Sequence, residues 1–563
     1  MPTLLVVSCV YLVVPYLIFL LGWLRWWLAV PMAALLVVAS HCAVRKVPWF
    51  DRSADADCDG AGFDWRGLVS LVGVALLLSF LSGAGGYGAQ DSDHPKHNAV
   101  FKCLIEEPWP PTVSSPQGRF PLVYYTAWYL PASLVGKVVG WEGANHFLQF
   151  WTALGLVLSL LWFCLASRRV KWIVLGVFVC FSGLDIVGAT AVRLLEFVGR
   201  PGFDWAAFDW RSIDWSSLRW WNWQIRWWDM AGLRNYSSNM ALLFFVPHQA
   251  LSGWILTGIV MHLVGRESDG ARKTLLFFVA LSCLWAPFVT LGFAPLVIFD
   301  LWAGRRSLVQ TVRAYLSLPN FAGLVIFGLM ALYFLARFSE LPFEDAPGAR
   351  FAFWAPPGAS ALGFLAGLLV FFCLEVGILA WAVARIDPFD DGRSKGLFVA
   401  ALAFLFLLPF FRYGGVNDLV MRASIPSLFV LAVFVARAIL RQGADRGKKW
   451  VLIVVLALGA ANPFAEVYRH VRATHHNGRL VTIPEQEGVD PLWTLNCLLR
   501  EHAMRDDSPL FRAFRSDTFF RQYIGTSDSL FFKHLARPPI AAVLPASDND
   551  QAGSAETPAN AVP

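Results

Sequence analysis

Long apolar runs separated by polar loops make up most of the chain, from the first residues to about residue 466. A helix needs roughly 20 apolar residues to cross a bilayer, and the sequence carries about thirteen runs near that length. Backbone polar groups in lipid must find their partners within the segment, so nearly all of these runs should be α-helical. Their expected extents are 3 to 24, 27 to 44, 68 to 88, 143 to 166, 172 to 192, 240 to 264, 274 to 289, 291 to 303, 319 to 337, 359 to 384, 396 to 410, 424 to 440 and 449 to 466.

This pattern predicts an all-α polytopic membrane protein, and the composition agrees with it. Of 563 residues, 57% are hydrophobic and 15% are charged, and the mean hydropathy is +0.53. One soluble core could not hide that much apolar surface. The first run has no basic segment before it and reaches the second after only Gly22–Arg25, so we expect a retained N-terminal hairpin. The sequence contains no P-loop, dinucleotide fingerprint or nucleic-acid motif, so no nucleic-acid partner is expected.

Lysine and arginine cluster in alternate loops. Such residues flank membrane spans on the cytoplasmic side, so thirteen spans would place all six basic loops in the cytoplasm. The N-terminus would then be cytoplasmic and the C-terminus exterior. The basic loops contain Arg45, Lys46, Arg52 and Arg66; Arg168, Arg169 and Lys171; Arg266, Arg272 and Lys273; Arg305 and Arg306; Arg385, Arg393 and Lys395; and Arg441, Arg446, Lys448 and Lys449.

The same patterns divide the chain into four parts. Residues 1–67 form the N-terminal hairpin and a cytoplasmic loop, and residues 68–466 form a membrane core. Residues 467–543 form a small exterior region, and the composition of 544–563 predicts disorder. The main exterior loops of the core are expected at 89–142 and 193–239, with smaller ones at 338–358 and 411–423.

Two features of the exterior regions leave alternatives open. Residues 203–228 carry repeated tryptophans, which suit a stretch lying along the membrane interface or a loop that stacks sugars or gates lipid. Cys103 and Cys497 are the cysteines expected on the exterior side. Because that compartment is oxidising, they could form a disulfide there or remain free thiols.

A cluster of polar residues follows the third apolar run. Its members are Asp91, Asp93, His94, Lys96, His97 and Asn98, in a segment expected to form a helix from Pro95 to Glu107. A carboxylate can cap a helix start, but that role explains Asp93 alone. The group also suits a carboxylate base beside side chains that bind a phosphate or a sugar. A zinc or manganese site is a further alternative, although the spacing matches no strong metal signature.

Two more polar segments are expected at the same membrane face. Their residues are His248, Gln249, Arg412, Asn417, Asp418 and Arg422. The first segment would line either a wet cavity or packed protein. In the second, Gly414 and Gly415 permit a tight turn, and the arginines can bind phosphate oxygens. Alternatively, Asp418 simply pairs with Arg422 at i,i+4 spacing.

The layout resembles the GT-C superfamily of integral membrane glycosyltransferases, which includes the protein O-mannosyltransferases and the aminoarabinose transferases of lipid A. The resemblance covers about residues 68 to 466 and lies in the many spans, an acidic pair in an exterior loop that begins a helix, and a short exterior tail region. Three segments resemble parts of bacterial membrane proteins near that superfamily. They are Asp93-His-Pro-Lys-His-Asn-Ala-Val-Phe, Val246-Pro-His-Gln-Ala-Leu-Ser-Gly-Trp and Asn417-Asp-Leu-Val-Met-Arg-Ala-Ser-Ile-Pro.

This resemblance implies a transferase of the bacterial inner membrane that moves a sugar from a polyprenyl-phosphate donor to a lipid, glycan or protein acceptor on the exterior side. No cofactor is certain, and a divalent metal is possible. Asp93 would be the general base, and Asp91 would orient the acceptor or a metal. Lys96, Arg412 or Arg422 would neutralise the departing phosphate. The chain lacks a directly adjacent acidic pair and adds an N-terminal hairpin, so Asp91 and Asp93 remain rivals for the role of base.

Two other functions fit the pattern. A transporter or flippase of a lipid-linked saccharide should place ionisable residues or broken helices near the middle of the membrane. Here such residues gather mostly at one face, apart from Asp185, Glu375 and a few others. In a non-catalytic partner in envelope polysaccharide assembly, the cluster would serve only as a cap and an ion-pair network. The placement at one face favours the transferase.

Overall fold

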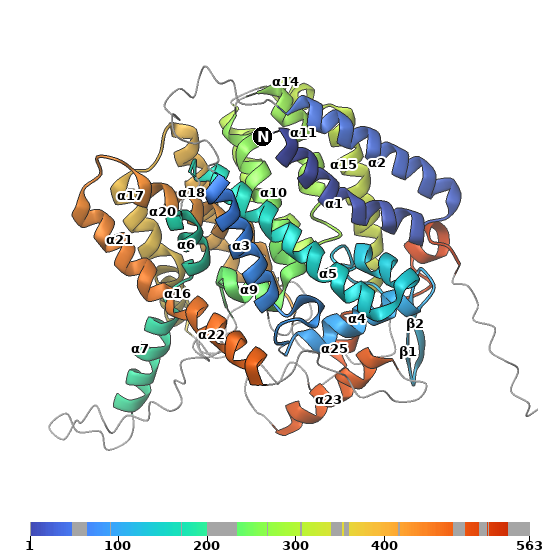
Figure 1. The fold of residues 1–563 in the computed structure, drawn as a ribbon. Coiled ribbons are helices and arrows are strands. Elements are labelled where there is room, and N and C mark those ends of the chain that lie inside the picture. Colours follow the sequence, from blue (N-terminus) through green and yellow to red (C-terminus); the bar gives the residue numbers. More distant parts are fainter. Residues whose placement is uncertain are drawn as a thin grey trace, which may run out of the picture.

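The computed structural model is mostly helical, which confirms the expected all-α class (Figure 1). It describes residues 2–47, 65–90, 92–169, 172–199, 234–266, 268–304, 307–338, 352–353, 360–414, 417–476, 490–505, 515 and 517–538. Asp91, Gly415, the tryptophan-rich stretch 203–228 and the tail 544–563 lie outside these ranges. Predictions that rest on those residues therefore stay predictions.

Most of the described α-helices coincide with apolar runs of the sequence. They are α1 (Pro2–Trp23), α2 (Trp26–Lys46), α3 (Trp65–Leu81), α4 (His94–Glu106), α5 (Leu130–Ala166), α6 (Trp172–Cys180), α7 (Asp185–Val198), α9 (Asn239–Phe245), α10 (Pro247–Gly265), α11 (Asp269–Ala280), α12 (Pro287–Gly292), α13 (Ala294–Ala303), α14 (Leu308–Tyr315), α15 (Leu318–Leu335), α16 (Ala361–Phe372), α17 (Ile378–Ile386), α18 (Gly392–Leu407), α19 (Asp418–Ala423), α20 (Ile425–Leu440), α21 (Arg446–Gly459), α22 (Ala461–His476), α23 (Pro491–Arg505) and α25 (Thr518–Arg521).

Strands are few and short within the described ranges. Strands β1 (Thr112–Ser115) and β2 (Gly118–Pro121) form an antiparallel hairpin in which Thr112 lies opposite Pro121. Strands β3 (Ala352–Phe353) and β4 (Phe411–Arg412) form a second antiparallel pair. The β3–β4 pair places Arg412 in an extended segment just before α19.

Eight helical segments of the described chain are long and apolar enough to cross a membrane. They are Pro2–Trp23, Trp26–Lys46, Leu130–Ala166, Trp172–Val198, Leu318–Leu335, Ala361–Ile386, Gly392–Phe410 and Arg446–His475. Shorter apolar helical segments occupy Trp65–Leu81, Pro287–Ala303 and Ile425–Leu440. These segments are those of a multi-pass membrane protein.

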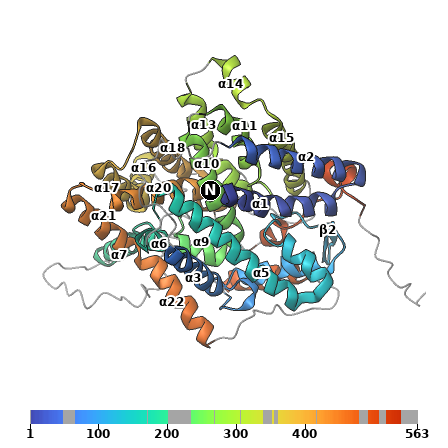
Figure 2. The same ribbon diagram turned by 45° about the horizontal axis from the view of Figure 1, so that its top comes forward.

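Helix α10 lies near the middle of the bundle in both views (Figure 1, Figure 2). It packs against α5, α11 and α20 and is buried along nearly its whole length. Close packing requires small residues on two of its faces. A Cβ atom on Gly253 would lie 2.6 Å from the Ile425 side chain, and one on Gly258 would lie 2.4 Å from that of Trp162. A helix surrounded by protein tolerates polar residues that lipid would exclude, and this position explains how α10 carries His248 and Gln249.

Helices α11, α12 and α13 occupy the expected spans 274 to 289 and 291 to 303. With 12 residues, α11 extends about 18 Å at 1.5 Å per residue, well under the roughly 30 Å of a hydrocarbon core. The turn that follows it is buried against α1. There the Leu284 amide donates to the Tyr16 hydroxyl at 2.9 Å, and Trp285 stacks on Tyr11 with ring centroids 5.3 Å apart. A non-helical turn at this depth is possible because protein, not lipid, surrounds it.

The two ends of the bundle differ in chemistry. Helix α14 lies at one end, and α4, α23 and α25 cover the other, which we call the capped end (Figure 1). Four arginines meet two carboxylates at the α14 end. Asp390 pairs with Arg168 at 3.1 Å and with Arg437 at 3.2 Å, and Asp300 pairs with Arg272 at 3.1 Å and with Arg393. Loops that the sequence predicts to be basic therefore meet at one end.

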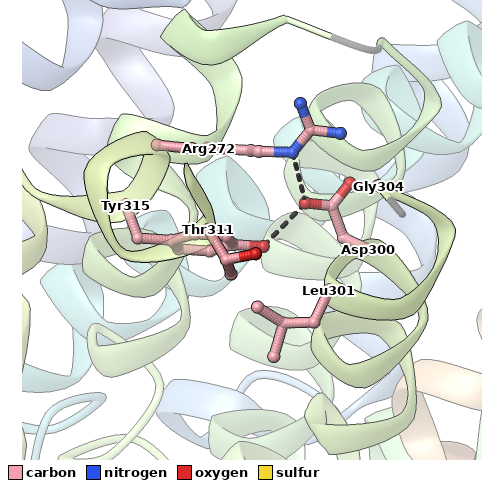
Figure 3. A pocket seen from close by; sticks show the side chains of 7 residues that line it. Arg272, Asp300, Leu301, Gly304, Thr311 and Tyr315 are labelled. Carbon is pink, nitrogen blue, oxygen red and sulfur yellow. Dashed lines mark hydrogen bonds and ion pairs between the residues drawn. The ribbon is translucent and has the colours of Figure 1, made fainter. Parts of the chain in front are cut away.

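A small hollow lies beside one of these ion pairs. Figure 3 shows Arg272 and Tyr315 directed at Asp300, with Thr311 and Leu301 nearby. The Tyr315 hydroxyl donates to the Asp300 carboxylate at 2.7 Å. This network ties α11, α13 and α14 together at the end opposite the capped end.

The C-terminal segment closes on the N-terminal hairpin. The Arg25 amide donates to the Leu535 carbonyl at 2.9 Å, and its guanidinium donates to the carbonyls of Ala536 and Lys533, each at 3.0 Å. In return, the Arg537 guanidinium donates to the Leu24 carbonyl at 2.8 Å. The turn between α1 and α2 is thereby clasped by residues from the far end of the chain.

Candidate functional site

The start of α4 brings part of the predicted polar cluster to the capped end. Asp93 occupies the N-cap position, but its side chain makes no capping hydrogen bond in the described chain. Instead, Asp93 forms an ion pair with Lys96 at 2.7 Å, one turn along the helix. Both side chains keep some exposure, 27% and 17%. The cap explanation for Asp93 is therefore wrong, and its carboxylate stays accessible at the helix start.

His97 lies on the buried side of α4 and is held by two hydrogen bonds. Its Nε2 is 2.8 Å from the Phe245 carbonyl, and its Nδ1 is 2.6 Å from the Tyr129 hydroxyl. A carbonyl only accepts, so Nε2 carries the proton and Nδ1 accepts from tyrosine. His97 thus joins α4 to α9 and to the start of α5. The sequence predicts a substrate-binding role for it, whereas both its nitrogens contact protein.

His94 and Asn98 also pack inside the protein. The Asn98 amide donates to the Gln90 side chain at 2.8 Å, and Gln90 in turn donates to the Gly83 carbonyl at 3.1 Å. Gly83 has a φ of 75° in the left-handed region, and a Cβ there would lie 2.9 Å from the His94 ring. These contacts shape the loop between α3 and α4. Both residues were predicted to bind substrate, and their contacts give them a positioning role.

His248, at the start of α10, lies beside this segment and has no exposed surface. Its ring stacks on Tyr125, with centroids 5.1 Å apart and planes 13° apart, and it meets the His97 ring edge-on at 5.1 Å. Within the described residues, neither of its ring nitrogens has a hydrogen-bond partner. Leaving buried polar atoms unpaired costs about 1–3 kcal/mol each. A satisfied packing histidine, the alternative reading of the sequence, does not fit this geometry.

The neighbouring Gln249 has the same property. Its side chain is buried, and its Oε1 is without a hydrogen-bond partner among the described residues. Two adjacent residues at the start of one helix therefore hold unused polar atoms. The start of α10 and the polar segment at α4 were predicted to lie at one membrane face, and the contacts of His248 with His97 and Tyr125 bring them together.

Helix α19 contributes the third predicted segment. Asp418 and Arg422 form an ion pair at 3.6 Å, as the i,i+4 alternative predicts. The pair is also part of the wider site, because Arg422 and Lys96 both lie within electrostatic range of the His248 ring. Asp93, Lys96, His248, Asp418 and Arg422 are called the His248 cluster below. Three segments far apart in sequence thus converge.

Tyrosines fill the space between these charged groups. Burial raises the pKa of Tyr125 to about 12, with Asp418 raising it further and Arg422 opposing the change. Burial also raises the pKa of Tyr523, and the charges of Asp93 and Asp418 add to that effect. Both carboxylates of the His248 cluster therefore act on one phenol.

Asn417 and Arg412 differ in their relation to the cluster. Asn417 is buried at a φ of 59°, its Oδ1 accepts from the Tyr413 amide at 3.4 Å, and its Nδ2 has no partner in the described chain. Arg412 donates to the Gly414 carbonyl at 3.4 Å and lies close enough to Arg234 for the two charges to interact. Neither of these contacts joins Arg412 to His248 or Arg422, so its predicted role beside Arg422 gains no support from them.

Sequence reasoning missed the aromatic wall and Arg234. Tyr124 and Tyr125 come from the loop before α5, and Tyr523 comes from the C-terminal region, where its ring lies 4.7 Å from that of Tyr124. Two adjacent tyrosines in a loop expected on the exterior side were a usable signal. Nothing in the tail pattern marks Tyr523, because its partners are some 400 residues away in the chain.

Metal and disulfide alternatives are less well supported. Over the described ranges, no group of three or more His, Cys, Asp or Glu side chains is arranged to hold a metal ion. Cys103 is buried and its thiol lies 3.8 Å from the Thr112 carbonyl, whereas Cys497 is exposed, and both are free. Helices α4 and α23, which carry them, nevertheless pack together.

The site thus combines two partly exposed carboxylates, two cations, an aromatic wall and an imidazole with unused hydrogen-bonding capacity. Such a set can remove a proton from a hydroxyl, hold a phosphate and stack a sugar ring. Comparison of the chain with protein-family models, curated proteins and solved structures finds no match.

Proposed function

We propose that the chain is a GT-C-type glycosyltransferase of the bacterial inner membrane. It moves a sugar from a polyprenyl-phosphate donor to a lipid, glycan or protein acceptor on the exterior side. In this proposal the chain crosses the membrane thirteen times, as its sequence predicts, so that the N-terminus is cytoplasmic and both the capped end and the C-terminal region lie outside. The observation that carries the proposal is the convergence of Asp93, His248 and Arg422, from three distant segments, at the capped end.

In this proposal Asp93 is the general base. Its carboxylate takes the proton from an acceptor hydroxyl while the acceptor oxygen forms a bond to the anomeric carbon of the sugar. The bond from that carbon to the phosphate oxygen breaks, and the polyprenyl phosphate leaves with the electron pair. Lys96 and Arg422 stabilise the negative charge of the leaving phosphate. The ion pair between Lys96 and Asp93 keeps the base and one of these cations in register.

His248 and the tyrosines hold the sugar. The face of Tyr125 already stacks on His248, so an aromatic surface and two free ring nitrogens adjoin each other. A saccharide has apolar C–H faces, which can pack on the aromatic surface, and hydroxyl groups, which can hydrogen-bond to the ring nitrogens. Binding would give the His248 nitrogens the hydrogen bonds that the described protein does not supply.

Single substitution of each acidic residue tests the proposal. Asp93→Asn and Asp91→Asn keep the side-chain shape but remove the basic carboxylate, and transfer from polyprenyl-phosphate sugars is measured for the purified protein in lipid. We expect one of them, Asp93→Asn, to lose about 10²- to 10⁴-fold in rate, the usual contribution of a general base.

Glu106→Gln is the matched control. Glu106 lies on the same helix as Asp93 but is 61% exposed and pairs only loosely with Lys102, at 3.9 Å. This variant should retain full transfer activity. Full activity in both aspartate variants would overturn the catalytic proposal.

One observation favours a second candidate, the transport or flipping of a lipid-linked saccharide. Asp185 and Glu375 are buried together where three helical segments are interrupted, an arrangement seen in transporters. This candidate predicts movement of a labelled lipid-linked saccharide between the leaflets of proteoliposomes, which Asp185→Asn would slow. A transferase would leave the saccharide distribution unchanged while consuming the donor.

A further inference from the structure

The C-terminal segment 517–536 pairs with the loop that leads into α5. The Val123 amide donates to the Tyr523 carbonyl at 2.7 Å, and the Gly525 amide donates to the Pro121 carbonyl at 2.9 Å. The residues between these two bonds face each other in an antiparallel bridge. The pairing therefore holds the backbone immediately before the two adjacent tyrosines of the aromatic wall.

Glycine at position 525 allows the two chain segments to approach closely. A Cβ atom on Gly525 would lie 2.6 Å from the Val123 side chain and 3.1 Å from the Ala336 carbonyl, just after α15. In addition, the Tyr333 hydroxyl of α15 accepts from the Tyr124 amide at 3.1 Å. The loop before α5 is thus held between a membrane helix and the C-terminal segment.

Four aromatic rings run from the C-terminal segment to His248. The Tyr523 ring lies 4.7 Å from that of Tyr124, and the Tyr124 ring lies 3.7 Å from that of Tyr125, measured between ring centroids. Tyr125 in turn stacks on His248 at 5.1 Å. Tyr523 and Tyr124 are 2% and 3% exposed, so both rings are enclosed by protein. Because close-packed interiors transmit displacements, a change at Tyr523 should reach His248 through this row of rings.

The position of Tyr523 is set by the C-terminal region itself. Asn496 of α23 donates to the Asp517 carboxylate at 2.9 Å and accepts from the Phe520 amide at 3.1 Å. Arg500 pairs with the same carboxylate at 2.7 Å. These contacts fix α25, the short helix that ends two residues before Tyr523. Helices α23 and α25 cover the capped end (Figure 1), and the C-terminal region thereby delivers the Tyr523 ring to the site.

We propose that Tyr523 is a positioning residue of the sugar-binding surface formed by Tyr125 and His248. Its ring supports Tyr124 and Tyr125, and this stack holds the His248 ring in the orientation that offers its nitrogens to the sugar. The effect depends on the aromatic ring of Tyr523 and not on its hydroxyl. This role of Tyr523 rests on the proposed function, because it lies within the same site. It also makes the C-terminal region a component of the site that the helical core forms.

Kinetics of the full chain in lipid nanodiscs test this role, with the polyprenyl-phosphate sugar that the wild type transfers fastest as the donor. Tyr523→Leu removes the ring and should raise the donor KM about 2- to 10-fold, which corresponds to the loss of one aromatic contact. Its kcat should stay near the wild-type value, because Asp93 and the cations that hold the leaving phosphate are unchanged. Tyr523→Phe keeps the ring and should keep the wild-type KM.

Phe531→Leu is the matched control. Phe531 belongs to the same segment and is 0% exposed, but its ring packs on those of Phe19 and Tyr333, with centroids 6.2 and 5.2 Å away. This variant should lower the melting temperature without raising the donor KM. An equal rise of KM in Tyr523→Leu and Phe531→Leu would show a general loosening of the C-terminal region and overturn the proposal, as would an unchanged KM in Tyr523→Leu. A fall of kcat in Tyr523→Phe would assign the role to the hydroxyl and overturn it too.

Histidine NMR supplies a readout that needs no sugar transfer. With histidine rings isotopically labelled in the full chain, the His248 resonances are identified by their absence in His248→Phe. Tyr523→Leu should shift these resonances, because Tyr125 no longer lies at a fixed place over the ring, and Tyr523→Phe should not. Unchanged His248 resonances in Tyr523→Leu would overturn the proposal even where transfer is confirmed. A wild-type protein without transfer activity would instead refute the proposed function.

Discussion

Replacing His248 and His97 separately by phenylalanine should change stability in opposite directions. The two rings lie 5.1 Å apart and are 0% and 2% exposed, so their environments are closely matched. They differ in hydrogen bonding. His97 uses both nitrogens, on Tyr129 and Phe245, whereas neither nitrogen of His248 has a partner in the described chain.

The expected magnitudes follow from this difference. His97→Phe loses two hydrogen bonds worth about 1 kcal/mol each and strands two buried partners, so it should destabilise the protein by about 2–4 kcal/mol. His248→Phe keeps the stack on Tyr125 and removes unpaired polar atoms, which releases about 1–3 kcal/mol. Fitting the larger ring offsets part of that gain. We expect a net stabilisation of about 1 kcal/mol for His248→Phe.

Melting temperatures of the two variants in one detergent or lipid provide the comparison, with transfer activity measured in parallel. His248→Phe should melt at or above the wild-type temperature yet lose transfer, because the ring nitrogens no longer reach a substrate. His97→Phe should melt clearly lower. If His248→Phe destabilises the protein as much as His97→Phe does, then His248 is an ordinary packing residue and the site assignment fails.

Three further predictions concern charged residues. Asp300→Asn removes the partner of two arginines from a position that is 2% exposed, and it should lower the free energy of unfolding by about 3–5 kcal/mol. Asp390→Asn, at 37% exposure, should lower it by under about 1 kcal/mol. Equal melting temperatures of the two variants would contradict this. Burial, with added repulsion from Glu106 and Glu107, raises the pKa of Asp490 to about 6. A raised carboxyl pKa means that the folded state holds the proton more tightly, so stability is lost as the pH rises from about 4 to 6. Asp490→Asn should therefore be the more stable form at pH 7.5 but not at pH 4, which melting curves at the two pH values will show. Arg422→Ala should lower transfer about 10- to 100-fold through loss of a charged hydrogen bond, and Arg412→Ala should lower it much less; equal losses would show that both arginines contact the donor.

Hydrophobic periodicity was sufficient to predict the helical class and the positions of most helices. The expected span 143 to 166 is the second part of α5, after Gly140, where a φ of 80° interrupts the helix. The expected helix from Pro95 to Glu107 is α4, displaced by one residue. Such features can be predicted from the sequence because they depend on residues that are close together along the chain.

Features that depend on lateral packing were beyond the sequence pattern. The pattern does not show that α10 is enclosed by protein on all sides, nor that the turn after α11 is buried against Tyr16. Charge alternation predicted that distant polar segments share one end of the bundle, but it carried no information on which side chains meet. Hence Arg412 was grouped with Arg422, although its contacts lead to Arg234, and the pairing of Asp185 with Glu375 was not foreseen.

The clasp between Arg25 and the C-terminal segment has a consequence for biosynthesis. The Arg25 guanidinium and its acceptor at Ala536 are 511 residues apart. At roughly 5–20 residues per second, translation separates their appearance by about 25 to 100 s. During that interval, water or lipid headgroups must hydrogen-bond to the polar groups of the turn between α1 and α2. The first hairpin therefore has to insert before the C-terminal segment that contacts it has been made. A chain whose synthesis stops between residues 476 and 531 contains every described membrane helix but lacks the C-terminal segment that contacts Arg25.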